Sequence, residues 1–370
     1  MTFTAEVAST VELQLDDGTR IVGTSFGAKR AVAGEVVFST AMTGYVEALT
    51  DPSYRGQILV LTYPLVGSYG VPGPRASGSL EGPYESDRIQ VQGLIVQKPI
   101  LRHSHHSASR SLHEWLTAEG VPGVAGIDTR ALTIRLRERG TIRGRIVSPA
   151  VQDDARVDEV DMADVARLVT PREIVRYEAG PRTVLVVDAG AKDNLVRSLL
   201  ARRVSVIRAP FTADIAKLAA EVDGIVLGSG PGDPKSLPQL VDTTRALLAS
   251  YPRPIFGVCL GSQILALAAG GDTVKLPYGH RGVNQPVQDL LTRRCYVTSQ
   301  NHGYAVVDGS LPSDWEAWFV NTNDGTNEGI RALTRPHFGV QFHPEAHPGP
   351  ADAGFLFDDF IRLAHAMRRP

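Results

Sequence analysis

The sequence predicts two α/β domains: a strand-rich one, then one with a mostly parallel central sheet flanked by helices. At 370 residues, the chain exceeds the length at which one hydrophobic core usually keeps growing. Short runs broken by Gly and Pro give way, after residue 181, to apolar runs separated by helix-length segments. We therefore expect an N-terminal domain over residues 1–152, a linker over 153–181 and a second domain over 182–370.

Composition narrows the possible partners and location. Lys and Arg number 38 and Asp and Glu 40, a formal charge of -2, which gives no electrostatic reason to expect nucleic acid or an anionic membrane. The 2 cysteines cannot form a disulfide framework, which fits a reducing compartment. Residues 1–10 lack the basic start and apolar core of a signal peptide, and no apolar run approaches the roughly 20 residues of a membrane helix. We expect a cytoplasmic, soluble protein.

In the first domain, β-rich runs at 35–38, 57–62 and 90–96 indicate strands. Apolar residues spaced by three and four predict amphipathic helices at 111–119 and 129–139, the second with Asp128 as N-cap.

In the second domain, nearly continuous apolar runs alternate with helix-length segments, which is typical of βαβ units around a parallel sheet. Later strands, joined by tight turns, should add antiparallel neighbours before a last helix. The parallel runs are 183–187, 204–207, 224–227 and 254–258; the later strands are 297–299, 305–307, 329–332 and 338–341, and the last helix is 351–367.

Cys259 lies in a Gly-x-Cys-x-Gly pattern between an apolar run and a helix-length segment. Gly257 and Gly261 lack Cβ atoms that would clash where a strand turns sharply into a helix, so the side chain between them would protrude. A helix N-terminus favours the thiolate, the form that attacks. A cysteine packed at a tight turn is the competing interpretation.

A thiol nucleophile needs a base and a group that orients the base. His343 and Glu345 in FGVQFHPEAHPGP are the candidates. If the strand continues to Glu345, residues two apart point to the same side. The alternative is a surface His in a proline-rich loop.

An acyl-transfer site also needs donors for the oxyanion, and GIVLGSGPGDP is a strand ending in a glycine loop. The expected donors are the N–H groups of Gly230, Gly232 and Leu260. A phosphate loop is disfavoured, because Lys235 and Ser236 follow Asp-Pro rather than Gly.

The segment TSQNHGYAV places Asn301 and Gly303 at an apparent turn between strands. They are either plain turn formers or polar groups that read the charged end of an amino acid.

Two further features predict no chemistry. The HSHH run at 103–106 lacks the folded cage of a metal site and is expected to be a solvated loop. Cys295, flanked by strand-like residues without a nearby base, is expected to be structural.

GVCLGSQ, GSGPGDP, QNHGYAV and HPE, in that order, resemble a class I glutamine amidotransferase domain over about residues 182–368. The resemblance implies that Cys259 attacks the side-chain amide of glutamine through a thioester, that His343 shuttles the proton to the departing ammonia, and that Glu345 orients His343.

Residues 34–64, GIDTRALT and KLPYGHRGVNQPV resemble the carbamoyl-phosphate synthetase small subunit, so the resemblance covers nearly the whole chain. It implies a heteromeric ligase whose large partner uses ATP and Mg to make carbamoyl phosphate from bicarbonate and ammonia, for pyrimidine or arginine biosynthesis. We expect no cofactor, nucleotide or metal on this chain.

The resemblance also implies glutamine-binding positions. Ala41 and Ser229 depart from the commonest family pattern, as does Ser262, and the segment around 71–88 resembles the longer form of the subunit. The implied positions are Ala41, Gly230, Gly232, Leu260, Gln263, Asn301, Gly303 and Tyr304.

Two other functions stay open at this point: a stand-alone γ-glutamyl cysteine hydrolase, and a non-catalytic scaffold that binds a partner. Retention of Cys259, His343 and Glu345 argues against the scaffold.

Overall fold

A computed structural model describes residues 9–76, 78–147 and 157–366. The chain forms two compact units, Met1–Met162 and Ala163–Pro370. Residues 163–181, expected as part of a linker, therefore fall within the second unit.

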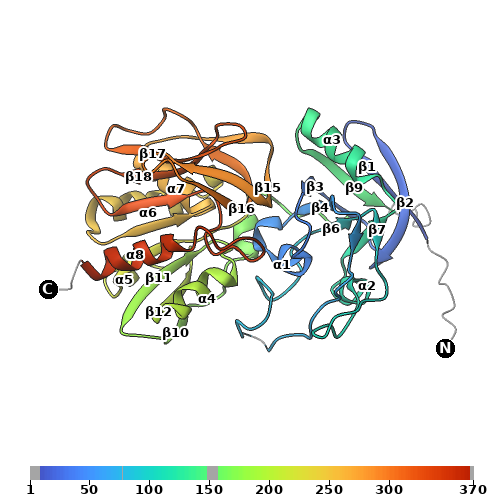
Figure 1. Cartoon of the computed structure of the whole chain (residues 1–370), viewed down its shortest axis with the longest axis horizontal. Coiled ribbons are helices and arrows are strands. Elements are labelled where there is room, and N and C mark those ends of the chain that lie inside the picture. The colour runs from blue at the N-terminus through green and yellow to red at the C-terminus, as the bar shows by residue number, and fades with distance from the viewer. Residues whose placement is uncertain (1–8, 77, 148–156, 367–370) are drawn as a thin grey trace. The chain divides into compact units, whose positions relative to one another are not determined.

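The first unit is built around a closed seven-stranded barrel (Figure 1). Closure follows because β9 pairs with both β3 and β1. The expected strands at 35–38 and 57–62 are confirmed within β3 and β4, whereas only the middle of 90–96 is a strand. In barrel order the strands are β1 (Thr10–Leu15), β2 (Arg20–Gly27), β8 (Pro122–Ala125), β6 (Gly93–Ile95), β4 (Gln57–Leu61), β3 (Val32–Ser39) and β9 (Ile142–Val147); β5 (Leu65–Val66) pairs with β7 (Lys98–Pro99).

Both helices predicted in this unit are confirmed. Helix α2 (Leu112–Ala118) begins with a capping box, in which the Ser111 hydroxyl accepts from the Glu114 N–H and the Glu114 carboxylate accepts from the Ser111 N–H. Asp128 caps α3 (Thr129–Arg139) by accepting from the Ala131 N–H at 2.9 Å. The short helices α1 (Tyr45–Thr50) and η1 (Pro52–Tyr54) follow β3.

The second unit contains a ten-stranded sheet. Five strands at its centre are parallel, with β10 antiparallel at one edge and four antiparallel strands on the other side. In sheet order they are β10 (Val175–Tyr177), β12 (Val204–Pro210), β11 (Arg182–Asp188), β13 (Gly224–Leu227), β14 (Ile255–Val258), β19 (His337–Val340), β18 (Asn327–Ala332), β17 (Trp315–Asn321), β15 (Thr273–Asp289) and β16 (Cys295–Val306).

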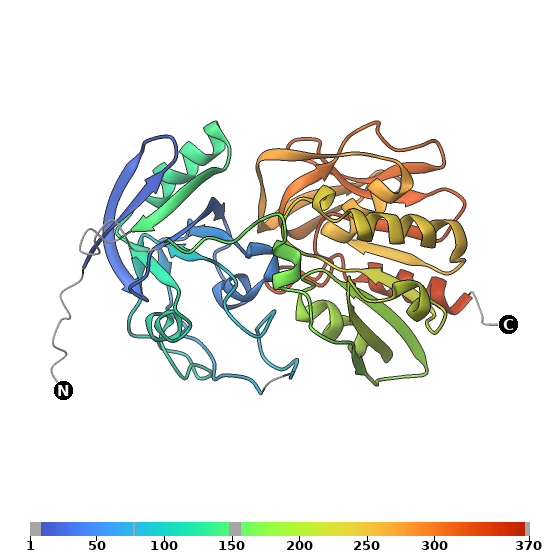
Figure 2. The same cartoon turned by 180° about the vertical axis from the view of Figure 1, so that it is seen from behind.

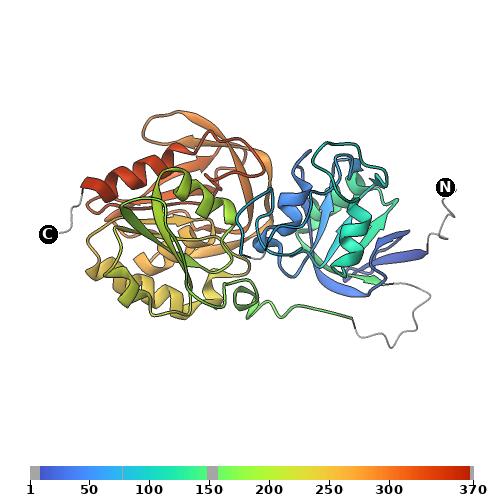
Figure 3. The same cartoon turned by 90° about the horizontal axis from the view of Figure 1, so that it is seen from below.

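Helices cover both faces of the parallel part. On one face, α4 (Asp193–Ala201) and α8 (Phe355–Ala366) lie side by side (Figures 1 and 3), joined by an ion pair between Arg202 and Asp358. The other face carries α5 (Ile215–Ala219), α6 (Pro238–Ser250) and α7 (Leu260–Ala269), whose apolar residues share one core with the strands (Figure 2). Strands buried on both faces explain the continuous apolar runs in the sequence. The 3₁₀ turns are η2 (Val165–Leu168) and η3 (Pro234–Ser236).

The structure corrects the expected turn at residues 298–306. Strand β16 runs without interruption from Cys295 to Val306, so Asn301 and Gly303 are not hairpin residues. The irregularity falls on the partner strand β15, whose register shifts between Lys275 and His280 and again between Gly282 and Gln285. Bulges on one strand allow the other to stay continuous.

In the described part of the chain, no helix is long and apolar enough to cross a bilayer.

Candidate active site

Cys259 occupies a sharp strand-to-helix turn between β14 and α7. Its φ of 53° is unusual for a residue other than glycine and costs on the order of 1–3 kcal/mol. The backbone N–H of Cys259 donates to the Val340 carbonyl oxygen at 2.8 Å. A Cβ on Gly261 would lie 2.0 Å from the Leu227 carbonyl oxygen, and one on Gly257 2.6 Å from the Gly261 oxygen. The steric reason for both glycines is therefore confirmed.

The thiol lies among backbone and amide groups and is buried. Its Sγ is 3.7 Å from the Asn301 carbonyl oxygen and 3.6 Å from Nε2 of Gln341. Nε2 of Gln263 donates to Oε1 of Gln341 and to the Tyr304 carbonyl oxygen, both at 2.9 Å. Asn301 therefore contacts the thiol directly, whereas Gln263 and Tyr304 are joined to it through Gln341, a residue that sequence reasoning missed.

His343 meets Glu345 by a different route from the one expected. Strand β19 ends at Val340, so the predicted continuous strand is wrong. His343 instead forms an isolated bridge to Ser299, donating its N–H to that carbonyl at 2.8 Å. Pro344, which has no N–H, cannot extend the ladder. The chain then turns, and Nδ1 of His343 lies 2.7 Å from Oε1 of Glu345.

The charges around His343 favour the protonated, imidazolium form of its side chain. Burial lowers the pKa of His343, but the charges of Glu345 and Cys259 outweigh it and raise that pKa to about 10. Burial raises the pKa of Glu345, yet His343 and then Lys192 bring it below its ordinary value. Nε2 of His343 is buried and has no hydrogen-bond partner within the described residues, which leaves it free to exchange a proton.

Two residues at the start of α4 hold the turn at Glu345, and no spacing pattern in the sequence marks either of them. The buried ammonium of Lys192 lies 4.0 Å from Oε1 of Glu345 and also donates to the Ala346 carbonyl oxygen. Nδ2 of Asn194 donates to the Glu345 carbonyl oxygen at 2.5 Å. A carboxylate held this way can orient His343 without being free to rotate.

The loop that carries Lys192 is itself fixed by buried charges. Arg208 on β12 lies between two carboxylates, with Nε 2.5 Å from Asp188 and Nη1 2.6 Å from Asp193. The other Asp188 oxygen accepts from the N–H groups of Gly190 and Ala191. The position of Lys192 therefore depends on an ion triad formed by the end of β11, by β12 and by the first residue of α4.

The glycine loop after β13 lies against the start of α7. A Cβ on Gly230 would be 2.8 Å from Cδ2 of Leu260 and 2.4 Å from the Ala189 carbonyl oxygen, and Gly232 has a φ of 91°. Ser229 is buried with no partner for its hydroxyl in the described part of the chain. The three predicted oxyanion donors thus belong to adjoining segments.

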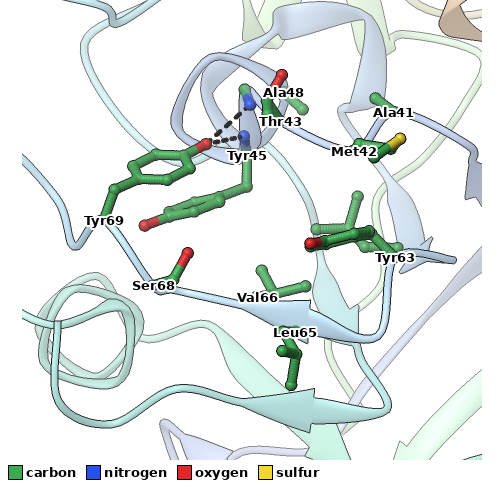
Figure 4. Close-up of a pocket in the computed structure, with 12 residues that line it drawn as sticks. Ala41, Met42, Thr43, Tyr45, Ala48, Tyr63, Leu65, Val66, Ser68 and Tyr69 are labelled. Atoms are coloured by element: carbon green, nitrogen blue, oxygen red, sulfur yellow. Dashed lines mark hydrogen bonds between the residues drawn. The ribbon is translucent and has the colours of Figure 1, made fainter. Parts of the chain in front are cut away.

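Ala41 lies in the first unit, at a pocket that also contains Met42, Tyr63 and Tyr69 (Figure 4). The Tyr69 hydroxyl accepts from the N–H groups of Gly44 and Tyr45 at 2.8 and 3.0 Å, which fixes the turn after Ala41. The contact of Ala41 with glutamine stays a prediction.

Two features were expected to carry no chemistry, the HSHH run and Cys295, and the structure places both of them. His105 and His106 are exposed in a loop, as predicted. Cys295, expected to be structural, is exposed. It starts β16, where its side chain faces solvent.

Comparison with known proteins identifies the family. The model of the carbamoyl-phosphate synthase small chain, CPSase domain, matches residues 13–146, and that of class I glutamine amidotransferases matches 185–363. The arginine-specific small chain of carbamoyl phosphate synthase from Neosartorya fischeri is 46% identical over 351 residues, covering 93% of this chain and 78% of that protein. The chain belongs to the carbamoyl-phosphate synthase small-chain family.

Two further curated proteins match most of this chain, and a solved structure matches part of it. The Neurospora crassa arginine-specific small chain is 43% identical over 366 residues, 97% of this chain and 81% of its own. The multifunctional protein pyrABCN of Emericella nidulans is 43% identical over 383 residues, which cover 94% of this chain and 17% of that protein. A solved glutamine amido transferase from Methylobacillus flagellatus is 19% identical, with a TM-score of 0.35, over 45% of this chain and 71% of its own. The two family models assign this small chain an N-terminal CPSase domain and a C-terminal amidotransferase domain.

Proposed function

We propose that this small chain hydrolyses glutamine through a Cys259 thioester and delivers ammonia to a large, ATP-using partner that makes carbamoyl phosphate from bicarbonate. The observation that carries the proposal is the buried Nδ1–Oε1 contact of 2.7 Å between His343 and Glu345. It occurs together with a cysteine at a strained strand-to-helix turn, in a chain whose family carries a glutamine amidotransferase domain.

In the proposed reaction, the Cys259 thiolate attacks the γ-carboxamide carbon of glutamine. N–H groups of Gly230, Gly232 and Leu260 stabilise the oxyanion. His343 gives its proton to the departing ammonia, which leaves a γ-glutamyl thioester. His343 then takes a proton from water, the hydroxide attacks the thioester, and glutamate leaves as the Cys259 thiolate is restored. One glutamine and one water give one glutamate and one ammonia.

The remaining predicted residues would bind the substrate. We assign Gln263, Asn301, Gly303 and Tyr304 to glutamine binding within the second unit, and Ala41 to a contribution from the first. ATP and Mg would act on the large partner, as the resemblance to the carbamoyl-phosphate synthase small-chain family implies.

Glutamate release tests the proposal, measured on the purified chain with and without its large partner and with Cys259→Ser as the blank. We expect cysteine-dependent release that rises when the partner is added. The Cys259→Ser complex should lose glutamine-dependent carbamoyl phosphate synthesis but keep synthesis from free ammonia. Loss of both would contradict the division of labour, and fast release without the partner would favour a stand-alone hydrolase.

A further inference from the structure

Gln341 contacts the thiol of Cys259, yet the proposed hydrolysis gives it no part. It directly follows the last residue of β19, and its side chain is buried. Its backbone N–H donates to the Glu328 carbonyl oxygen at 2.9 Å, which fixes the point from which the side chain extends. Nε2 of Gln341 lies 3.6 Å from Sγ. The role that this side chain can play depends on whether its amide presents an N–H or an oxygen to the sulfur.

A backbone carbonyl settles the direction of these hydrogen bonds. The Tyr304 carbonyl oxygen only accepts, so the Gln263 atom that lies 2.9 Å from it must be Nε2. The same Nε2 lies 2.9 Å from one side-chain atom of Gln341, which must therefore be the oxygen Oε1. Exchanging oxygen and nitrogen in either amide would bring two donors or two acceptors together at 2.9 Å. Gln341 therefore directs its N–H, rather than its oxygen, at the sulfur.

On its other side, Sγ of Cys259 meets an acceptor. It lies 3.7 Å from the Asn301 carbonyl oxygen, which suits a neutral thiol and disfavours a thiolate. The charge of the His343 imidazolium and the N-terminus of α7, which begins at the next residue, favour the thiolate instead. An N–H donor stabilises charged sulfur more than neutral sulfur, so Gln341 acts in the same direction as these two groups.

From this geometry we propose that Gln341 is a further catalytic residue, whose side-chain N–H stabilises Cys259 as the thiolate. The inference rests on the proposed glutaminase function. Before glutamine binds, the donor would keep the sulfur ionised. After hydroxide has added to the thioester, the C–S bond breaks and its electron pair returns to Sγ, where the same N–H would stabilise the charge. Gln263 would be a positioning residue as well, because it holds the Gln341 amide in this orientation.

The rival explanation gives Gln341 a structural role alone. Sγ would then be a neutral thiol that donates to the Asn301 carbonyl oxygen, and Gln341 would serve only to hold Gln263 for glutamine binding. Removing Gln341 would raise KM for glutamine and leave the charge of the sulfur unchanged. Because glutamate release responds to both roles, the deciding measurement is made on the sulfur without glutamine.

The experiment uses the full chain at neutral pH and reads Cys259 in two ways. Ultraviolet thiolate absorbance is taken as the difference between each chain and its Cys259→Ser counterpart. Alkylation by iodoacetamide is followed at each cysteine by peptide mass spectrometry, with the exposed Cys295 as the internal standard. Gln341→Met, which is similar in length but lacks the donor, should lose most of the thiolate absorbance. It should also slow alkylation of Cys259 by about 10-fold or more, with Cys295 unchanged.

Three further variants separate the two roles. Gln341→Leu also lacks the donor and should show the same losses, so it decides the matter if Gln341→Met does not fold. Gln263→Met should raise KM for glutamine but keep more thiolate than Gln341→Met, whereas the rival predicts an unchanged thiolate in both. The matched control is Gln288→Met, which removes the glutamine whose Nε2 lies 3.9 Å from Sγ of Cys295. It should leave the absorbance and alkylation of Cys259 unchanged.

The possible outcomes keep this inference distinct from the proposed function. Thiolate absorbance equal to wild type in Gln341→Met and Gln341→Leu, with equal or faster alkylation of Cys259, would overturn the donor role. Thiolate that is present in the wild-type chain and lost in these variants would support it. If the wild-type complex nevertheless released no glutamate from glutamine, the proposed hydrolysis would fail while the contact between Gln341 and the thiolate would stand.

Discussion

The two sides of the candidate active site are held in place by different forces. On the cysteine side, close packing of backbone fixes Cys259, because Gly257 and Gly261 leave no room for a Cβ. On the histidine side, buried charges and hydrogen bonds fix Glu345, through Lys192 and Asn194. One half of the site is therefore specified by glycines that lack a Cβ and the other by paired charges, so substitutions in the two halves should have different effects.

Glu345→Gln should have the largest effect on activity. A glutamine amide can present an N–H to Nδ1 and stabilise the wrong tautomer of His343, a change worth about 10⁴-fold in a comparable triad. Glu345 also raises the pKa of His343, so losing its charge should move the alkaline limb of kcat/KM to lower pH. Glutaminase pH profiles of the complex measure both effects. An unchanged alkaline limb would mean that Glu345 does not set the charge of His343.

Gly261→Ala should break the cysteine side by sterics alone. The new Cβ would lie 2.0 Å from the Leu227 carbonyl oxygen, so the strand or the helix must shift, and we expect a loss of more than about 4 kcal/mol in the free energy of unfolding. Urea denaturation of the full chain measures it. Gly73→Ala is the control, since its Cβ would meet only Oγ of Ser109 at 3.8 Å. Equal stability of the two variants would contradict the steric argument.

Arg208→Met tests the histidine side of the site through the ion triad that supports the Lys192 loop. It leaves the buried carboxylates of Asp188 and Asp193 without their cation, which should cost about 3–5 kcal/mol of stability. Arg176→Met is the control, because that arginine pairs with Glu221 on the exposed surface and should cost less than about 1 kcal/mol. Thermal and urea unfolding would show whether the triad, rather than any arginine, supports the Lys192 loop.

His337 is a buried histidine that belongs to neither side of the site. Burial lowers the pKa of His337 on β19 to about 4, since neither ring nitrogen has a partner within the described residues. The folded pKa lies below the unfolded value, so His337 favours folding fully above about pH 6.5, and this contribution falls as the pH drops toward 4.

His337→Phe should therefore flatten the acid loss of stability between about pH 6.5 and 4 by up to about 3 kcal/mol. Free energies of unfolding at several pH values measure the slope. The exposed His365, replaced in the same way, should leave the slope unchanged. A slope shared by wild type and His337→Phe would show that other groups dominate the acid limb.

The difference between the two sides also explains how much the sequence could predict. The parallel strands, the helix capped by Asp128 and the strand-to-helix turn at Cys259 follow from local patterns of apolar residues, caps and glycines. The path of the chain from His343 to Glu345 does not follow from such local patterns, because it depends on the bridge between His343 and Ser299.

Lys192, Asn194 and Gln341 were missed for a related reason. Each reaches the site by a contact between segments distant in sequence, with no spacing rule to mark it. The uninterrupted β16 was missed because the bulges that allow it lie on its partner strand β15.

The place of β19 in the sheet has a consequence for how the protein is made. This strand lies between β14 and β18 yet is the last strand in the chain, and its Val340 carbonyl anchors the N–H of Cys259. Until it emerges from the ribosome, the parallel and antiparallel halves of the sheet have no shared strand, and the nucleophile has neither its anchor nor its base. A nascent or truncated chain ending before His337 should therefore be inert toward glutamine, so that ammonia is released only by a finished protein.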